Sequence, residues 1–259
     1  MPAGSTSAAA PDYVPGHGLL AGKAVLVTAA AGTGIGFATA KRCLEEGATV
    51  VLSDAHERRL GEAAAELGVE GIPCDVTDEA AVQALVSGAA ERLGRLDVVV
   101  NNAGLGGTAP LVDMTDEQWD KVIDVTLTGT FRMTRAVLRV MRDQGDGVLV
   151  NNASVLGWRA QAGQAHYAAA KAGVMALTRC AAVEAAEYGV RVNAVAPSLA
   201  MHRFLAKVTS DELLDELTGR EAFGRAAEPW EVANVIVFLA SPYSSYMTGE
   251  VVAVSSQHP

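Results

Sequence analysis

The alternation of short β-branched runs with longer helical patterns constrains this chain more than any other feature. Helical periodicity covers Asp78–Leu93, Thr115–Arg142 and Gln164–Tyr188, among other stretches. Strands that are apolar throughout and separated by helices predict a parallel sheet covered on both faces. We therefore expect an α/β fold: one doubly wound domain built on a seven-stranded parallel sheet. The expected strands lie at 24–28, 49–53, 70–74, 96–101, 147–153, 190–195 and 250–255.

Two segments differ from this regular pattern. Residues 1–19 are rich in Ala, Gly, Pro and Ser, which predicts a flexible N-terminal arm before a single domain at residues 20–259. Residues 199–228 follow the sixth expected strand and are too long for a simple connection. Long excursions beyond the carboxyl ends of parallel strands often cover binding sites, so we expect a lid at about 199–228.

Composition limits the partners. Half of the residues are hydrophobic and 19% are charged, as in a folded protein. We find neither an apolar run of the roughly 18 residues that a membrane span needs nor a secretory signal at the N-terminus. A net charge of −10 repels phosphate backbones, which argues against nucleic acid. Cys43, Cys74 and Cys180 lack metal-ligand spacing, so we expect a reduced, cytoplasmic protein without a metal site.

A glycine-rich stretch, TAAAGTGIG, joins the first expected strand to a helix. Such a turn brings the backbone and the helix N-terminus close to a pyrophosphate. Ala30 stands where the pattern G-x-x-x-G-x-G has its first glycine, and an alanine forced to φ > 0 costs on the order of 1 kcal/mol. We expect the loop to bend at Gly32 instead; an ordinary turn is the alternative. The candidate cofactor-binding residues here are Ala30, Gly32, Thr33, Gly34, Ile35 and Gly36.

Asp54 ends the second expected strand, where a carboxylate would accept hydrogen bonds from an adenosine ribose. A carboxylate there repels a 2′-phosphate, which favours NAD over NADP. Arg58 and Arg59 follow closely and could bind that phosphate, so NADP stays possible. The alternative interpretation of Asp54 is a helix cap.

Ser154, Tyr167 and Lys171 form the most informative constellation. Tyr167 and Lys171 are spaced i, i+4, which places them one turn apart on one helix face. We expect the ammonium to lower the tyrosine pKa from about 10 towards working pH. Such a tyrosine can exchange a proton with a hydroxyl while a nicotinamide exchanges the hydride. Ser154, just after the fifth expected strand, can donate to a carbonyl oxygen that gains charge.

With these residues in place, the chain resembles the short-chain dehydrogenase/reductase family from about Gly22 to Ser255. The features are the glycine loop, CDV at 74–76, NNAG at 101–104, the Ser, Tyr and Lys constellation, NAVAP at 193–197 and TGE at 248–250. The resemblance implies a Rossmann-like fold and an enzyme that interconverts an alcohol and a ketone with NAD or NADP. The further cofactor-binding residues that it implies are Asp75, Val76, Asn101, Ala103, Gly104, Tyr167, Lys171, Pro197 and Leu199.

Three departures from the family pattern accompany this resemblance. Ala30 is the first. Thr126 replaces an asparagine that supports a proton-relay water in many members; its hydroxyl can still bond a water, so we keep Thr126 as a catalytic candidate. Ser198 and Met201 replace a glycine and a threonine, so contact with the cofactor's carboxamide must differ here.

The lid candidate mixes apolar and basic residues, and Trp158, Arg159 and His166 lie near the constellation. An apolar pocket with a basic rim suits a bulky hydrophobic substrate with an anionic handle, such as a coenzyme A thioester. An amphipathic helix with a solvated edge is the alternative. The lid residues concerned are Leu199, Met201, His202, Arg203, Phe204, Leu205 and Lys207.

The resemblance is strongest to actinobacterial members that act in steroid-ring breakdown and to 3-ketoacyl reductase-like enzymes. It implies a small-molecule substrate and a homotetramer or homodimer that pairs the long helices after the fourth and fifth strands. A non-catalytic dinucleotide-binding sensor or regulatory subunit is the alternative, suggested by Ala30, Thr126 and Met201. Retention of Ser154, Tyr167 and Lys171 argues against it, because a sensor needs no tuned tyrosine.

Overall fold

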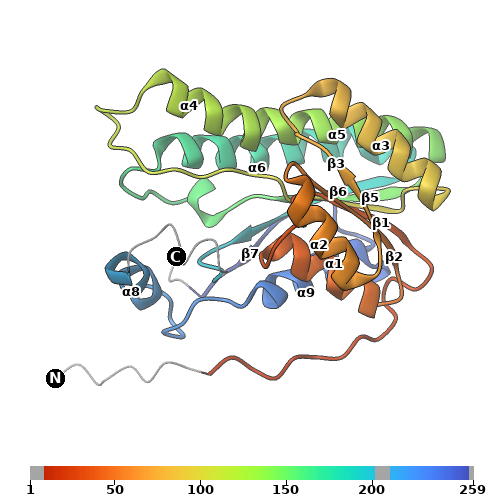
Figure 1. The fold of residues 1–259 in the computed structure, drawn as a ribbon, viewed down its shortest axis with the longest axis horizontal. Helices are drawn as coiled ribbons and strands as arrows, with labels where there is room; N and C mark the ends of the chain where they lie inside the picture. The colour runs from red at the N-terminus through yellow and green to blue at the C-terminus, as the bar shows by residue number, and fades with distance from the viewer. Residues whose placement is uncertain (1–8, 202–210, 257–259) are drawn as a thin grey trace.

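The computed structural model describes residues 9–201 and 211–256, with only the backbone for 211–213 (Figure 1). Its centre is one parallel sheet of seven strands in the order β3-β2-β1-β4-β5-β6-β7. The doubly wound α/β fold expected from the sequence is confirmed. The strands are β1 Ala24–Val27, β2 Thr49–Asp54, β3 Glu70–Pro73, β4 Val98–Asn101, β5 Gly147–Asn152, β6 Val190–Pro197 and β7 Val251–Val254.

Helices cover both faces of this sheet (Figure 1). The long helical pattern at 115–142 is two α-helices joined by a π-helical turn, η1, at Asp124–Thr128. None of the helices in the described ranges is both long and apolar enough to cross a membrane. The α-helices are α1 Ile35–Glu45, α2 Glu57–Leu67, α3 Glu79–Leu93, α4 Asp116–Ile123, α5 Gly129–Gln144, α6 Ala165–Ala185, α8 Asp211–Gly219 and α9 Pro229–Ala240.

Two hydrophobic layers form the core, one on each face of the sheet. Alternate residues of a strand point to opposite faces. In β1, Val25 and Val27 pack in the layer that α1, α2 and α9 cover, whereas Leu26 packs in the layer under α3, α5 and α6. All three side chains are fully buried.

The strand order reverses next to β1, which pairs with β2 on one side and with β4 on the other. Connections from β1 and from β4 therefore leave in opposite directions, and a crevice opens at the carboxyl ends of the two strands. The glycine loop follows β1 and the NNAG segment begins at the end of β4, so the topology brings both motifs to this crevice.

The N-terminal arm differs from the flexible segment that composition predicts. Within its described part, residues 9–19, the chain has no helix or strand, yet it is bound to α1 and α9. Arg42 of α1 and Glu46, the C-cap of that helix, form a buried pair at 2.8 Å. Arg42 donates to the carbonyls of Val14 and Pro15, and Glu46 accepts from the amide of Leu19 at 2.9 Å. The arm therefore supplies hydrogen-bond partners to two charged side chains that are buried away from water, and these bonds hold the arm in place.

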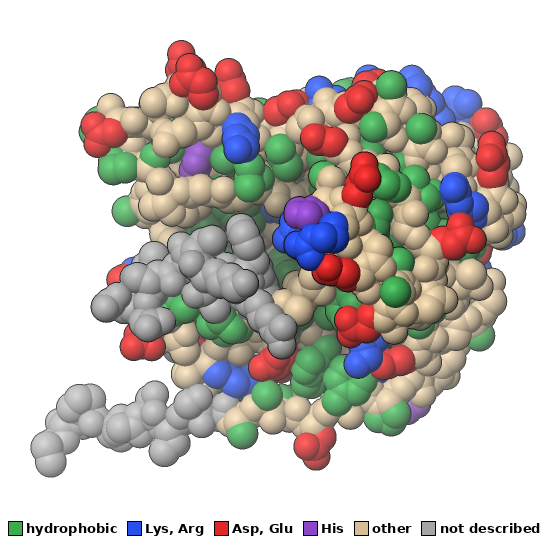
Figure 2. Space-filling model, viewed as in Figure 1, with side chains coloured by type: hydrophobic (Ala, Val, Ile, Leu, Met, Phe, Trp, Pro, Cys, Tyr) green, Lys and Arg blue, Asp and Glu red, His purple; other side chains and the backbone are tan. Residues whose placement is uncertain are grey.

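The two ends of the predicted lid lie side by side. The amide of Met201 donates to the carbonyl of Ala227 at 2.9 Å, and the amide of Ala227 donates to the carbonyl of Leu199 at 2.8 Å. The expected lid residues His202, Arg203, Phe204, Leu205 and Lys207 lie outside the described residues. Figure 2 shows this side of the molecule hollowed, with acidic side chains scattered over the surrounding surface.

Candidate active site

Ser154, Tyr167 and Lys171 meet at the carboxyl end of the sheet. Ser154 follows β5, is 8% exposed, and caps the short 3-10 helix η2 (Val155–Gly157) by accepting from the amide of Leu156. Tyr167 lies in the first turn of α6, and its phenol is hydrogen-bonded to the Ser154 hydroxyl. The structure thus brings together two hydroxyls that the sequence separates.

Lys171 lies one turn beyond Tyr167 and is 3% exposed. Its Nζ donates to the main-chain carbonyl of Asn152 at 2.6 Å and lies 5.5 Å from the centroid of the Tyr167 ring. The spacing of the two residues on one helix face is as predicted.

The expected effect of Lys171 on Tyr167 is wrong for this structure. Burial raises the pKa of Tyr167 to about 12, and the hydrogen bond with Ser154 lowers that pKa only in part. Burial also lowers the pKa of Lys171 to about 8. Both groups are removed from water, which disfavours the tyrosine phenolate and the lysine ammonium. This desolvation outweighs the attraction between the two charges.

Thr126 lies in the π-helical turn η1 and is fully buried. Its hydroxyl accepts from the amide of Leu105 and donates to the carbonyl of Leu105, both at 2.9 Å. A hydroxyl has one proton to donate, so these bonds leave Thr126 with no donor for a relay water. Its hydroxyl instead holds the segment that follows the NNAG motif. This segment lies beside Lys171, because a Cβ on Gly104 would stand 3.3 Å from Lys171 Nζ.

The glycine loop bends at Gly32, as predicted, with φ of 104°. Ala30 is fully buried and donates its amide to the carbonyl of Ser53 at 3.0 Å. The strained alanine is Ala29, with φ of 49°, which the sequence did not reveal. Gly36 permits the closest approach, because a Cβ there would stand 2.3 Å from the carbonyl oxygen of Ala29.

The loop fits a dinucleotide phosphate on two observations. Gly34 is the N-cap of α1 and no side chain caps that helix, so its first amides face the loop without a side-chain acceptor. A Cβ on Gly32 would meet nothing within 4 Å, so open space lies beside the backbone there. Thr33, Gly34, Ile35 and Gly36 are the residues that would hold the phosphates.

Asp54 lies against this loop. Its carboxylate accepts from the amide of Ala31 at 3.2 Å and from that of His56 at 2.9 Å. The N-cap of α2 is His56 and not Asp54, so the helix-cap interpretation is wrong. Arg58 is paired with Glu62 at 2.6 Å on the exposed face of α2.

The remaining cofactor candidates occupy different environments. Asp75 accepts from the amide and the hydroxyl of Thr77, and Val76 is buried against α5 at Gly129. Pro197 ends β6 at the same edge, and the amide of Leu199 lies 3.5 Å from a carboxylate oxygen of Glu221.

Among the NNAG residues, Asn101 turns away from the crevice. Its amide donates to the carbonyl of Thr130 at 3.1 Å and to Asn151 at 3.3 Å inside the core. The residue that faces the glycine loop is Asn102, which the sequence analysis left out. Side-chain alternation along β4 was the signal that could have found it. Ala103 donates its amide to the Thr28 hydroxyl at 3.2 Å.

Small residues let the chain pass close to Tyr167 and to His166. A Cβ on Gly106 would stand 3.8 Å from the tyrosine ring, and one on Gly107 would stand 3.1 Å from Nε2 of the buried His166. Trp158, which is 52% exposed, follows Ser154 at the end of η2. The Tyr167 ring therefore lies against the segment that contains Gly106, and Trp158 is exposed close to Ser154 in the sequence.

Comparison with known proteins agrees with this geometry. The model of a family described as enoyl-(acyl carrier protein) reductase matches residues 29–256. The chain is 68% identical to a (5R,7aS)-5-hydroxy-7a-methyl-1-oxo-2,3,5,6,7,7a-hexahydro-1H-indene-carboxyl-CoA reductase of Mycobacterium tuberculosis, over 96% of this chain and 98% of that one. It is 42% identical to a cis-4-hydroxycyclohexanecarboxylate dehydrogenase of Sinomonas cyclohexanicum, over 89% and 94%.

A solved structure is similar as well. The crystal structure of a short chain dehydrogenase from Mycobacterium smegmatis is 62% identical, covers 97% of this chain and 99% of its own, and superimposes with a TM-score of 0.87. The fold, the arrangement of Ser154, Tyr167 and Lys171, and these likenesses agree. The chain is an oxidoreductase and belongs to the short-chain dehydrogenase/reductase family.

Proposed function

We propose that the protein interconverts a secondary alcohol and a ketone on a bulky ring substrate carried as a coenzyme A thioester, with NAD(H) as cofactor. The observation that carries the chemistry is the hydrogen-bonded pair of Ser154 and Tyr167 beside Lys171. Two adjacent hydroxyls suit one oxygen that is a carbonyl in one direction and an alcohol in the other.

Tyr167 acts as the acid in reduction. A nicotinamide cofactor held at the glycine loop would supply the hydride that the carbonyl carbon receives. The Tyr167 phenol gives its proton to the carbonyl oxygen, and the Ser154 hydroxyl donates to the same oxygen as negative charge grows there. A pKa of about 12 keeps Tyr167 protonated at neutral pH, which is the form that reduction needs.

Lys171 supports this step electrostatically. A protonated Lys171 stabilises the phenolate that Tyr167 becomes after it has given up its proton. The carbonyl of Asn152 holds Nζ in place at 2.6 Å. In the oxidative direction the same groups work in reverse: Tyr167 as phenolate accepts the hydroxyl proton.

The substrate class is supported by the relatives and by the site. One relative is named for a bicyclic ketone with a hydroxyl and a carboxyl-CoA group, and another for a hydroxylated cyclohexane ring. A methyl-bearing hydroindene has the fused six- and five-membered rings of the steroid C and D rings, so we infer a steroid-ring fragment. Trp158, which is 52% exposed and follows Ser154 at the end of η2, offers a flat apolar surface for such rings.

Tyr167→Phe tests this function. Removing the proton donor should lower kcat about 10²- to 10⁴-fold on a carbonyl or alcohol substrate, while NADH binding followed by nicotinamide fluorescence stays near wild type. A Tyr167→Phe variant that turns over at the wild-type rate would disprove the assignment. A wild-type protein that binds NADH but turns over no member of a panel of cyclic ketones and coenzyme A thioesters would favour the sensor alternative.

We infer NAD(H) in preference to NADP(H), and a cytoplasmic location where this coenzyme and coenzyme A thioesters are found. Asp54 supports the first inference, since its carboxylate faces the glycine loop. A negative charge at that place repels a ribose 2′-phosphate. Arg58, one of the two basic residues that could offset this repulsion, is paired with Glu62.

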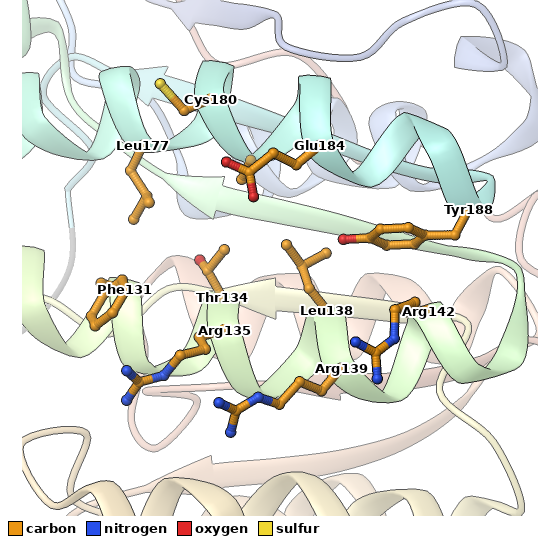
Figure 3. Close-up of a pocket in the computed structure, with 11 residues that line it drawn as sticks. Phe131, Thr134, Arg135, Leu138, Arg139, Arg142, Leu177, Cys180, Glu184 and Tyr188 are labelled. Carbon is orange, nitrogen blue, oxygen red and sulfur yellow. The ribbon is translucent and has the colours of Figure 1, made fainter.

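We also propose assembly into a homotetramer or homodimer through α5 and α6. A groove of about 350 Å³ runs between these helices, and Leu138 and Leu177 point into it (Figure 3). It lies away from the catalytic residues. Phe131 at its end is 40% exposed and Val183 of α6 is 76% exposed, so a second copy would cover apolar side chains here.

A further inference from the structure

Two asparagine side chains join the carboxyl ends of β4 and β5. Asn152 Nδ2 donates to Asn102 Oδ1 at 2.8 Å. Asn102 Nδ2 in turn donates to the carbonyls of Thr28 at 3.2 Å and Ala29 at 3.1 Å. We call Asn102 and Asn152 the asparagine bridge. It connects the fifth strand to the start of the glycine loop.

The main chain of Asn152 faces the catalytic lysine. Its carbonyl is the acceptor for Lys171 Nζ, at 2.6 Å. Side chains alternate along a strand, so Asn151 points towards α6, where its amide donates to Thr178 at 3.0 Å, while Asn152 points to the opposite face. A single residue is therefore linked to the glycine loop through Asn102, which its side chain contacts, and to Lys171 through its own carbonyl.

The glycine loop needs support where the bridge reaches it. Ala29 has φ of 49° and is the one non-glycine residue with positive φ within residues 9–201 and 211–256. That conformation is strained for a residue that carries a Cβ. A Cβ on Gly36 would stand 2.3 Å from the Ala29 carbonyl oxygen and 2.6 Å from Asn102 Nδ2, so α1 packs directly against this peptide. Asn102 therefore holds the carbonyl of Ala29 against α1, the helix whose N-terminus would bind the phosphates.

Asn152 is also incompletely bonded. Its Oδ1 is buried and has no hydrogen-bond partner within the described residues. A buried acceptor without a partner is costly, and it is available to a donor of a bound molecule.

We propose that Asn152 is a positioning residue that couples the dinucleotide loop to Lys171. Through Asn102 it keeps the Ala29 peptide in the left-handed conformation, and through its own carbonyl it keeps Lys171 beside Tyr167. The inference rests on the proposed function, since it assigns Asn152 to that same site.

Hydrogen–deuterium exchange and NADH binding test the coupling without relying on turnover. Asn152→Ala leaves Asn102 Oδ1 without its donor, so amide exchange in residues 28–36 should rise in the cofactor-free protein. NADH binding, followed by fluorescence titration, should weaken about tenfold, the effect of losing one hydrogen bond and leaving its partner unpaired. Asn151→Ala is the matched control: it removes the neighbouring amide, whose partners are in the core, and should leave both readouts at wild-type values.

A double-mutant cycle separates a bridge from two independent contacts. Asn102→Ala, Asn152→Ala and the double variant should weaken NADH binding to the same extent, because each breaks the same path. Asn152→Ser retains a hydroxyl donor and should restore part of the affinity. Additive losses, or equal effects of Asn151→Ala and Asn152→Ala, would overturn the proposal.

Asn102→Asp gives a second route if Asn152→Ala does not fold. The aspartate still accepts from Asn152 but cannot donate to Thr28 or Ala29, so exchange in residues 28–36 should again rise. Unchanged exchange there would contradict the coupling. The exchange experiment is independent of the reaction: a wild-type protein without turnover would refute the proposed function, whereas flat exchange in the variants would refute the role of Asn152.

Discussion

Asp54 is the residue through which the glycine loop would distinguish two cofactors. Its carboxylate accepts from the Ala31 amide and lies against the loop that would hold the phosphates. Asp54→Asn keeps the shape and removes the charge, so the affinity for NADPH should rise about tenfold relative to that for NADH. Fluorescence titration with both cofactors measures the ratio. Glu57→Gln, an equal charge change on the exposed first turn of α2, is the control and should leave the ratio unchanged.

Lys171 makes stability depend on pH. Burial lowers its pKa from 10.5 to about 8, so between those values the unfolded chain binds more protons than the folded one, and folding stability rises with pH. Lys171→Met removes this dependence. The unfolding free energy of wild type minus that of Lys171→Met should therefore increase by about 3 kcal/mol between pH 8 and pH 10.5.

Urea unfolding of the cofactor-free protein at several pH values measures this shift. Lys121→Met is the control, because Lys121 is exposed on α4 and its replacement should give a difference that stays flat over the same range. A flat difference for Lys171→Met as well would mean that the folded protein keeps this lysine solvated.

Single residues show where prediction from the sequence stops. Ser154, Tyr167 and Lys171 were predictable because two of them share a helix turn and the third follows a clear strand. Asn152 was not, because its partner Asn102 is 50 residues away and nothing in the local pattern pairs them. The pKa of Tyr167 was predicted in the wrong direction, since burial depends on the whole fold and not on the spacing to Lys171.

Helix α1 approaches the loop that precedes it more closely than any side chain would permit. A Cβ at Gly36 would stand 2.3 Å from a backbone oxygen, so Gly36→Ala should destabilise the fold by about 1–3 kcal/mol or prevent folding. Gly61 lies inside α2 with nothing within 4 Å of an added Cβ. Gly61→Ala should instead stabilise by about 0.5–1 kcal/mol, and thermal unfolding of the two variants compares them. Equal effects would contradict the close approach at Gly36.

The elements themselves followed from periodicity, with two exceptions. The π-helical turn at 124–128 was not predicted; within it Thr126 is bonded to Leu105, a contact between segments that local periodicity does not link. The bound arm was not predicted either. Arg42 and Glu46 at i, i+4 are typical of an exposed helix pair, and only the folded chain shows that both are buried under residues 14–19.

At the scale of the whole molecule, α5 and α6 carry apolar side chains that remain exposed in the single chain. Val183 is 76% exposed, so Val183→Glu should leave the stability of the single chain unchanged. If copies pair through these helices, a buried charge should weaken association about tenfold or more, as measured by analytical ultracentrifugation. Val112→Glu, at a 92% exposed position before α4, is the control and should not alter the mass.

The doubly wound sheet could be predicted in full because strand order in such folds follows from a few topological rules, and the crevice beside β1 followed with it. The shape of the substrate pocket could not. Its described border includes the backbone bonds between Leu199, Met201 and Ala227, which join residues far apart in the chain and which no periodicity encodes.

The buried ion pair of Arg42 and Glu46 depends on hydrogen bonds from the arm that precedes the first strand. The match to the family starts at residue 29, and trimming the chain to that point, or to the first strand, would strip the carbonyl and amide partners from Arg42 and Glu46. Two full charges would then face solvent beside bare apolar side chains such as Trp230, which Tyr13 now covers. Recombinant versions should therefore keep everything from Tyr13 onward, because these residues pack against the rest of the chain.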